Sequence, residues 1–573
     1  MSELMRKIGS LVRANWFVRC LLGMMGGYLF CVLLNYFYFD GKGAALFAMQ
    51  LYGLCFATLF ICVCAAVPYM GVIVYFVVCF VASVLSYAYS HFGYVLSDEL
   101  IYATCETTSE ELGGLVTSHF VLCMVWKLLV LMLLFYALRY VFGINRRMCG
   151  MRRCLMLAGT SVALLVCYSL PSVVFFRIPW PDAEIPGKIV RCLSPQNYRW
   201  HPFFSFPGQR PPFEYFMENY RLPVSDLKKL VLGIREYHTD IELVDTAGFA
   251  SELTRDDDLV CVLAIGESTR ADHFGLNGYA RNTTPRLSAM PGICNFSNMY
   301  SYGGSTEFSF RSIFTGLTQE NEQVSRMSFV PILRKHGFRC CYYSENTADM
   351  TRSRMGELTM GKYLDDRAAI NGSIDSVVKQ IRERICSVDS PRQFVVVQNG
   401  TGHYPYAHDK KYTCYQPSQR MEEGDDAART GLLNDYDNCI VAIDAFLAGI
   451  IEGLRDKNAV LLYTADHGEL LGEDGKWNHG DSGNPYLRHV AAFIWFSDAY
   501  REKYPELVSQ IENCKDKPLI HGQFFATILR LCGVQSNVPL NVGDFVDDDI
   551  RNHANNLPCE ILKGLGTPAE VQE

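Results

Sequence analysis

The 573-residue sequence lacks several features that would assign it quickly to a class of protein. It has 22 cysteines but no Cys-x-x-Cys pair and no cysteine–histidine cluster with zinc-finger spacing. It has no excess of basic residues. The formal net charge is -8, so no basic face is expected to neutralise nucleic-acid phosphates. It also has no internal repeat and no low-complexity tract. These absences argue against nucleic acid as a partner.

Hydrophobic residues make up 49% of the chain and are concentrated in its first third. Five apolar runs there are long enough to cross a bilayer, which takes about 20 residues. The runs are 17–38, 44–67, 70–92, 119–142 and 153–177. Because successive runs with hardly a charge inside them are rare in soluble domains, we expect transmembrane helices rather than buried core helices. The first run is long and is followed by further spans, so we do not interpret it as a cleaved signal peptide.

Lysine and arginine residues between these runs predict the orientation of the chain. The N-terminal segment and the loop before the last run are basic, whereas the loop between the third and fourth runs is acidic and has no Lys or Arg. The basic segments are expected in the cytoplasm, which places everything after residue 177 outside. We therefore predict a transmembrane domain at 1–177, a membrane-surface linker with a helix at 178–245, and an extracytoplasmic domain at 246–573. The linker is equally consistent with an ordinary loop.

From residue 258 onward, short apolar runs alternate with helix-like stretches. The runs are Leu259–Ile265, Phe338–Tyr343, Phe394–Val397, Val460–Tyr463 and Val490–Phe496. Short runs rich in Val, Ile, Leu and aromatic residues are typical of parallel strands that are buried on both faces. We therefore expect an α/β domain with a mostly parallel sheet.

Three of these runs lead into residues that bind metals or carry protons. Glu267 follows the first run, His403 follows the third, and Asp466, His467 and then His479 follow the fourth. The carboxyl ends of parallel strands meet at one edge of a sheet, so these side chains are expected to converge. Zinc takes carboxylate and imidazole ligands and keeps one open position in catalytic sites. Singly, each residue is more often a turn, a cap or a solvated charge, but together they predict a metal site.

The segment Gly266–Tyr279, which reads GESTRADHFGLNGY, resembles the opening motif of bacterial phosphoethanolamine transferases. That family belongs to the alkaline phosphatase and sulfatase superfamily. Further matches are RNTTP at 281–285, GST at 304–306, YDN at 436–438, DHGE at 466–469, HG at 479–480 and the late His521. The resemblance covers the whole chain, the membrane spans included, and implies an alkaline-phosphatase/sulfatase-like catalytic domain.

In that family a Glu, the nucleophilic Thr and an Asp-His pair hold the metal. The resemblance therefore implies a Zn²⁺ site formed by four residues, which are Glu267, Thr306, Asp466 and His467. It implies that two further histidines, His403 and His479, bind the substrate phosphate or a second metal and act as acid and base.

Thr306 also fits this role on physical grounds, because it follows a Gly-Gly-Ser turn and precedes the helix-like stretch Glu307–Thr315. A helix N-terminus favours an ionised hydroxyl, although an ordinary helix N-cap is the alternative interpretation.

The acidic outer loop adds two further candidates. The segment ETTSEEL at 106–112 is similar to a family segment expected to reach the active site. Glu111 and Thr108 are therefore possible substrate-binding residues, with Glu111 meeting an ethanolamine ammonium. A solvated acidic loop is about as consistent with this segment.

The implied reaction moves phosphoethanolamine from phosphatidylethanolamine, through a phospho-threonine intermediate, to a cell-envelope acceptor such as lipid A, lipopolysaccharide core or a glycan. The implied location is the bacterial inner membrane, with membrane lipids around the spans and the catalytic domain in the periplasm. If the acceptor is an outer-membrane phosphate, masking its charge should weaken binding of cationic antimicrobial peptides.

The sequence also departs from the family pattern near the substrate. No cysteine flanks Thr306, Glu307 stands where Ala is usual, Thr108 replaces Asn, and 344–349 replaces a loop with Asn, Lys and paired Cys. These departures leave the acceptor open. A related phosphoglycerol transferase and a non-catalytic regulatory relative remain alternatives. A formylglycine sulfatase is disfavoured, because its C/S-x-P-x-R pattern is absent around Thr306.

Overall fold

The structure is a computed structural model, and the residues it describes are chiefly 69–92, 118–141 and 244–546. Within the last range, the residues outside the description are 318–326, 346–353, 405, 419–425, 474–476, 480–483 and 541. The chain divides into two compact units. The first contains most of α4 (Met70–Phe92) and all of α7 (Ser118–Val141), and the second contains the residues from Ile234 onward.

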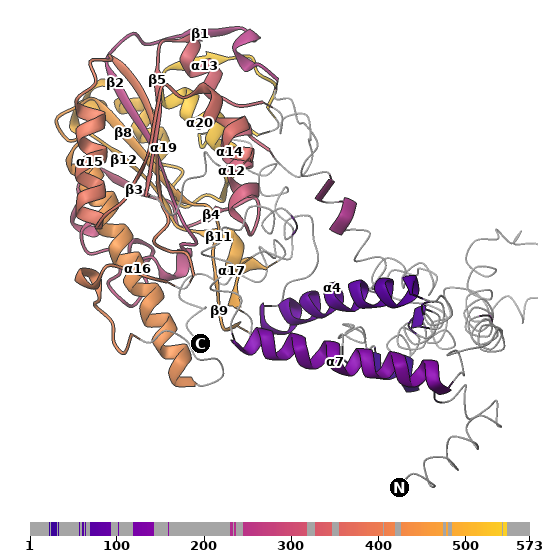
Figure 1. Cartoon of the computed structure of the whole chain (residues 1–573). Helices are drawn as coiled ribbons and strands as arrows, with labels where there is room; N and C mark the ends of the chain where they lie inside the picture. Colours follow the sequence, from indigo (N-terminus) through magenta and orange to yellow (C-terminus); the bar gives the residue numbers. More distant parts are fainter. Residues whose placement is uncertain are drawn as a thin grey trace, which may run out of the picture. The chain divides into compact units, whose positions relative to one another are not determined.

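The helices α4 and α7, which are labelled in Figure 1, consist largely of apolar residues. Their segments Met70–Ala88 and Phe120–Tyr140 have mean hydropathies of 2.3 and 2.4, so both are long and apolar enough to cross a bilayer. The two helices contact each other, since the Tyr75 hydroxyl donates a hydrogen bond to the Leu131 carbonyl oxygen at 3.1 Å.

These two helices agree with the predicted spans 70–92 and 119–142. The other predicted spans, 17–38, 44–67 and 153–177, lie largely outside the described residues. They stay predictions, as do the domain boundaries at 177 and 245.

A seven-stranded sheet forms the centre of the second unit, in the order β3-β12-β8-β2-β7-β5-β6. The strands are β2 (Leu259–Gly266), β3 (Ile293–Asn295), β5 (Arg339–Glu345), β6 (Asp366–Ile370), β7 (Arg392–Asn399), β8 (Ala459–Ala465) and β12 (Ala492–Phe496). The pairings from β8 through β2, β7 and β5 to β6 are parallel. Only β12 is antiparallel to its neighbours, β8 and β3, so the predicted mostly parallel sheet is confirmed.

Each predicted apolar run coincides with a strand of the structure. The last run divides at Ala491 into β11 (His489–Val490) and β12. β11 pairs with β4 (Met299–Tyr300) in a separate three-stranded sheet that also contains β13 (Leu519–Ile520). The strands β3 and β6 were not predicted.

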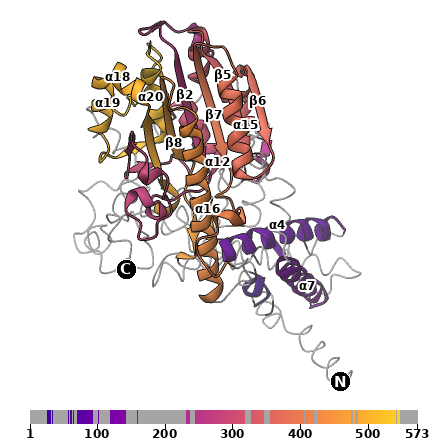
Figure 2. The same cartoon turned by 90° about the vertical axis from the view of Figure 1, so that its left-hand side faces the viewer.

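Helices cover both faces of the sheet (Figures 1 and 2). α15 (Ile374–Cys386) and α16 (Asp426–Glu452) lie on one face, and α12 (Thr306–Thr315), α13 (Val330–Lys335) and α20 (Phe524–Leu531) lie on the other. Every residue of β2 is buried, with alternate side chains in the two hydrophobic cores. This explains the unbroken apolar run, because a parallel strand covered on both faces has no polar side. Polar and charged side chains that could carry chemistry are therefore expected at the ends of the strands.

Candidate metal and catalytic centre

The ends of β2 and β8 bring together two carboxylates and an imidazole. In the parallel pairing of these strands, Gly266 lies opposite Ala465, so the next residues, Glu267 and Asp466, emerge side by side. The Asp466 backbone N–H donates to the Gly266 carbonyl oxygen at 3.0 Å. His467 follows, with its Nε2 3.4 Å from Glu267 Oε1 and 3.5 Å from Asp466 Oδ2. One ligand atom from each of the three side chains lies within 4.8 Å of the others.

The burial and the negative charges of this group favour a bound cation. Burial, and then the neighbouring Asp466 carboxylate, raise the pKa of Glu267 to about 8. Asp466 is fully buried, and its Oδ1 accepts hydrogen bonds from the backbone N–H groups of Ser268 (3.0 Å) and His467 (2.7 Å). Its Oδ2 receives no hydrogen bond from any residue that the structure describes. Since a buried carboxylate oxygen is costly without a partner, these residues fit a metal ion.

The tautomer of His467 supports the same conclusion. Its Nδ1 lies 2.8 Å from the Gly468 carbonyl oxygen, which can only accept a hydrogen bond. The proton is therefore assigned to Nδ1, and the Nε2 lone pair faces the two carboxylates. A backbone carbonyl that fixes the other ring nitrogen is the usual arrangement around a metal-binding histidine.

Thr306 lies at the edge of this group. It is the first residue of α12, and Ser305 is the N-cap with extended backbone (φ -147°, ψ 156°). The Thr306 hydroxyl is 3.3 Å from His467 Nε2. The structure thus brings Glu267, Thr306, Asp466 and His467 together as the sequence predicts, although their roles as ligands stay a prediction. Because Ser305 holds the N-cap position, the Thr306 hydroxyl is available for chemistry.

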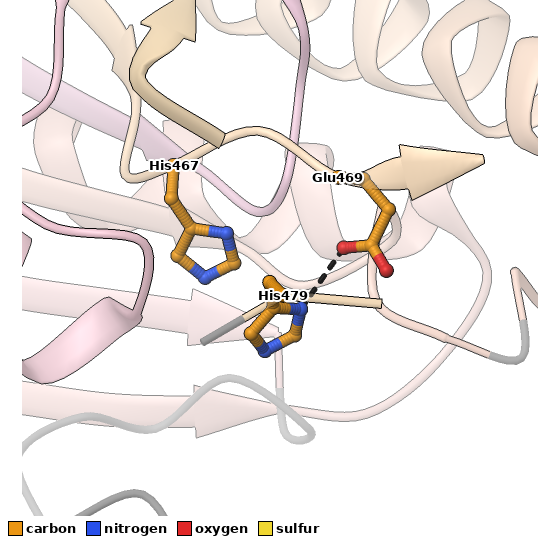
Figure 3. Close-up of side chains that lie close together, drawn as sticks. All are labelled: His467, Glu469 and His479. Carbon is orange, nitrogen blue, oxygen red and sulfur yellow. Dashed lines mark hydrogen bonds and ion pairs between the residues drawn. The ribbon is translucent and has the colours of Figure 1, made fainter. Parts of the chain in front are cut away.

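A second group of possible ligands shares His467 with the first. It contains His467, Glu469 and His479 (Figure 3). Glu469 is fully buried, and its two oxygens contact His479 Nδ1 at 2.9 Å and the Tyr406 hydroxyl at 3.0 Å. Burial raises the pKa of Glu469 to about 7. The sequence motif contained Glu469, but no role was predicted for it.

Of the two predicted acid–base histidines, His479 belongs to this group and His403 lies next to it. The ring centroids of His479 and His467 are 4.2 Å apart, and those of His403 and His479 are 5.7 Å apart. His403 Nδ1 is 2.8 Å from the Tyr404 carbonyl oxygen, which leaves Nε2 as the nitrogen able to exchange a proton with a ligand. The candidates Glu111 and Thr108 lie outside the described residues.

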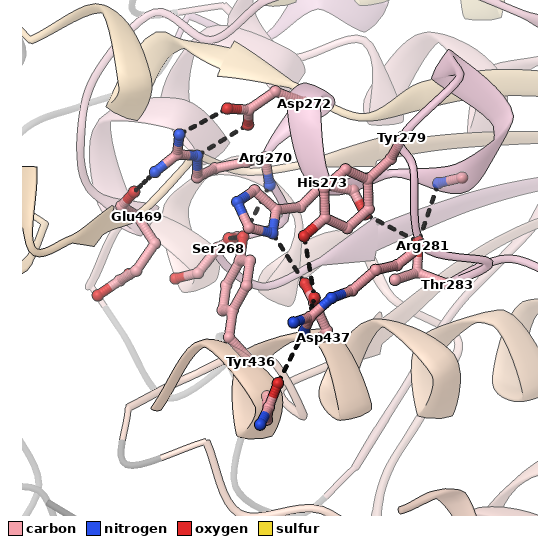
Figure 4. Close-up of polar contacts among 12 residues, drawn as sticks. Ser268, Arg270, Asp272, His273, Tyr279, Arg281, Thr283, Tyr436, Asp437 and Glu469 are labelled. Atoms are coloured by element: carbon pink, nitrogen blue, oxygen red, sulfur yellow. Dashed lines mark hydrogen bonds and ion pairs between the residues drawn. The ribbon is translucent and has the colours of Figure 1, made fainter. Parts of the chain in front are cut away.

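A dense polar network supports the turn after β2 (Figure 4). The buried Arg270 guanidinium forms two hydrogen bonds with the Asp272 carboxylate, at 2.8 and 2.6 Å, and one with Glu473 at 2.6 Å. The Tyr436 hydroxyl of α16 donates to the Ser268 carbonyl oxygen at 2.6 Å and accepts from the Arg270 backbone N–H at 2.9 Å. Sequence reasoning assigned no role to these residues. The contacts of Arg270 with Glu473 and Tyr436 join distant segments, whereas its contact with Asp272 is local.

Another buried carboxylate, Asp437, ties the following segment to α16 (Figure 4). It accepts hydrogen bonds from the Tyr279 hydroxyl (3.0 Å) and the Arg281 guanidinium (2.7 Å), and it contacts His273 Nδ1 at 2.8 Å. The RADH and GYARN parts of the sequence motif are therefore anchored to the helix that carries the YDN motif.

Comparison with known families matches both parts of the chain. Residues 260–534 match the family described as Sulfatase, and residues 54–179 match the family described as Phosphoethanolamine transferase EptA/EptB. These matches cover the sheet domain and a segment that contains both apolar helices.

Individual relatives are similar over part of their length. The chain is 27% identical over 307 residues to the Kdo(2)-lipid A phosphoethanolamine 7''-transferase of Salmonella typhimurium, covering 49% of this chain and 52% of that protein. It is 28% identical over 302 residues to the phosphatidylethanolamine transferase Mcr-1 of Escherichia coli, covering 48% and 54%. The chain thus spans about half the length of the curated relatives it matches.

A solved structure shares the fold over most of the chain. The integral membrane lipooligosaccharide phosphoethanolamine transferase A of Neisseria meningitidis aligns with a TM-score of 0.67 at 19% identity, covering 93% of this chain and 97% of that one. At this identity the likeness shows the fold alone.

Proposed function

The chain belongs to the phosphoethanolamine transferase EptA/Mcr family with a sulfatase-type domain, and from this premise we propose that it transfers phosphoethanolamine from phosphatidylethanolamine to a cell-envelope acceptor. The acceptor class is a lipid A, lipopolysaccharide core or glycan group outside the cytoplasm. The apolar helices α4 and α7 would anchor the enzyme in the bacterial inner membrane as part of a multi-pass domain, with the catalytic domain in the periplasm.

Four side chains would hold a zinc ion: Glu267, Thr306, Asp466 and His467. Zinc, when bound, would supply the positive charge that favours the ionised Thr306 hydroxyl and polarises the phosphoryl oxygens. The N-terminus of α12 supports the same ionisation, because its backbone N–H groups place a partial positive charge beside Thr306.

The reaction would have two steps. In the first, Thr306 Oγ1 bonds to the phosphorus of the donor while the bond from phosphorus to the diacylglycerol oxygen breaks, and the leaving oxygen takes a proton from His403 or His479. In the second, the acceptor oxygen gives its proton to the same histidine and bonds to phosphorus, and the bond to Thr306 breaks. The outer-loop residues Glu111 and Thr108 would contact the substrate.

One observation carries this proposal: the Thr306 hydroxyl lies 3.3 Å from His467 Nε2, at the edge of a buried group whose Asp466 Oδ2 receives no hydrogen bond from the described residues. A nucleophilic hydroxyl at a helix N-terminus, next to carboxylates that need a cation, suits phosphoryl transfer. The same geometry would serve a phosphoglycerol headgroup, so the choice of headgroup rests on the family.

The test uses the full-length protein purified in detergent with zinc and a fluorescent phosphatidylethanolamine. We expect diacylglycerol release and a phosphoethanolamine mass shift on the peptide that contains Thr306. Thr306→Ala should abolish both, and Thr306→Ser, which keeps a hydroxyl, should retain part of the turnover. Phosphatidylglycerol is offered in parallel.

The outcomes separate the alternatives. Turnover of phosphatidylglycerol alone would favour a phosphoglycerol transferase. A protein that binds zinc but releases diacylglycerol from neither lipid would favour a non-catalytic role. For the acceptor, a deletion strain with unchanged polymyxin sensitivity would argue against an outer-membrane phosphate.

A further inference from the structure

Ser268 has a backbone conformation that residues other than glycine rarely adopt. It follows Glu267 directly, is fully buried, and has φ of +54°. For a residue with a Cβ, the left-handed region carries an energetic cost, and such residues gather at sites where the surrounding structure enforces them. The burial of Ser268 does not by itself explain why the residue adopts this φ.

Every polar group of Ser268 contacts the centre or its support. Its backbone N–H donates to Asp466 Oδ1 at 3.0 Å, and its hydroxyl donates to Glu267 Oε1 at 2.9 Å. Its carbonyl oxygen accepts the hydrogen bond from the Tyr436 hydroxyl at 2.6 Å. One residue thus contacts the carboxylate that follows β2 and the carboxylate that follows β8.

The Ser268 side chain also lies near the second ligand group, because it lowers the pKa of the Glu469 carboxyl against the larger effect of burial. Ser268 is therefore close to both of the groups that share His467.

The neighbouring chain leaves this turn little room to move. A Cβ placed on Gly402 would lie 2.1 Å from the Glu267 carbonyl oxygen, so the backbone of the loop after β7 packs directly against the turn. With the backbone held in this way, the hydrogen bond from the Ser268 hydroxyl to Oε1 can fix the direction of the Glu267 side chain.

We propose that Ser268 is a positioning residue for the metal centre: its hydroxyl and backbone N–H hold the Glu267 and Asp466 carboxylates side by side, in the arrangement that one ion requires. The Glu267 side chain has several rotatable bonds, so without these donors its carboxylate can turn away from Asp466. The proposal rests on the zinc chemistry of the proposed function. A residue that orients a ligand in this way typically changes metal affinity by about 10–100-fold when it is removed.

A purely structural role would give a different result. If Ser268 only fills space, then substitutions should lower the stability of the metal-free protein, and zinc affinity should change only in proportion. The strained backbone allows the two roles to be separated, because glycine adopts φ above zero without cost whereas a β-branched residue does so poorly.

The test compares Ser268→Ala, Ser268→Gly and Ser268→Thr with the wild type, as full-length protein in detergent. Zinc affinity is measured by competition with a chromophoric chelator and by metal counting, and the thermal stability of the metal-free protein is measured separately. Ser328→Ala is the matched control, since Ser328 is also buried and its hydroxyl donates to the Thr359 carbonyl oxygen at 2.6 Å.

We expect Ser268→Gly to bind zinc about 10–100-fold more weakly although its metal-free form is at least as stable as that of Ser268→Ala. Ser268→Thr, which keeps the hydroxyl, should be less stable without metal but should bind zinc within about 3-fold of the wild type. Ser328→Ala should lose stability and keep its zinc affinity. Zinc affinity that follows stability across the series would overturn the proposal, as would wild-type affinity in Ser268→Ala. A wild type that binds no zinc would instead overturn the metal chemistry of the proposed function, and this inference with it.

Discussion

Four largely buried carboxylates lie close to the turn after β2. They form two pairs, which are Asp272 with Glu473 and Glu267 with Asp466. The protein itself supplies a cation to the first two, because both bind the Arg270 guanidinium. Although burial alone would raise them, Arg270 lowers the pKa of Asp272 and of Glu473. The second two have no Lys or Arg partner among the described residues, only the His467 imidazole at 3.4 and 3.5 Å, and the pKa of Glu267 is raised. The comparison suggests that the protein keeps one pair for stability and the other for a cation it must acquire.

The largest expected effect comes from removing the cation of the first pair. Arg270→Met should lower the free energy of unfolding by about 3–5 kcal/mol, because it leaves two carboxylates buried without a partner. Urea unfolding of the metal-free protein measures this. Arg334→Ala is the control: the pair of Arg334 with Asp365 is partly exposed, so its loss should cost less than about 1 kcal/mol. Equal effects of the two substitutions would contradict the comparison.

Removing a carboxylate from the second pair should have the opposite sign. Glu267→Gln should stabilise the metal-free protein at pH 7 by roughly 1–3 kcal/mol, since it removes a group that folding must keep protonated. The same substitution should abolish the stabilisation that zinc gives the wild type. Thermal unfolding with and without zinc tests both statements. A metal-free variant that is less stable than the wild type would show that Glu267 has a structural cation that we have not identified.

The pH dependence of stability should sharpen the contrast, and it has the smallest effect when counted per pH unit. For an acid whose pKa is raised on folding, the stabilising contribution is present below the unfolded value and is lost as pH rises through the folded value. For Glu267 and Glu469, the metal-free protein should therefore lose stability between about pH 4.5 and pH 8, by at most about 1.4 kcal/mol per pH unit for each group. Zinc should bind more tightly across the same range, because its ligands must lose their protons.

This measurement has an internal control. Thermal unfolding in chelator should show a shallower decline for Glu267→Gln than for the wild type. The pKa of Asp272 is lowered, so its contribution is present above the unfolded value and should be lost only in acid, as pH falls through the folded value. A metal-free wild type with constant stability from pH 5 to pH 8 would contradict the raised pKa values.

Much of the fold could be predicted from the sequence, because burial on both faces leaves a clear signal. All five apolar runs are strands, and β2 is buried at every residue. The antiparallel direction of β12 could not be predicted, since direction depends on the connection and not on composition. β6 was missed because its residues, DRAAI, are only partly buried at the edge of the sheet.

The site could be predicted to a similar degree. Glu267, Asp466 and His467 follow strands directly, and parallel pairing places such residues together without further information. The supporting contacts were not predictable in this way. A serine does not signal the left-handed backbone that Ser268 adopts, and the hydrogen bond from Tyr436 to Ser268 joins residues 168 positions apart. The outer-loop candidates Glu111 and Thr108 remain predictions.

The two hydrogen bonds of the Tyr436 hydroxyl limit which mutations the protein can accept during evolution. That one group bonds to the backbone on both sides of Thr269, at Ser268 beside the ligands and at Arg270 beside the stabilising charges. Loss of the Tyr436 hydroxyl would therefore disturb the ligand side and the stabilising side of the turn together, so we expect few substitutions of Tyr436 to be tolerated. New acceptor preferences would have to arise elsewhere, in loops whose alteration leaves this shared hydroxyl in place.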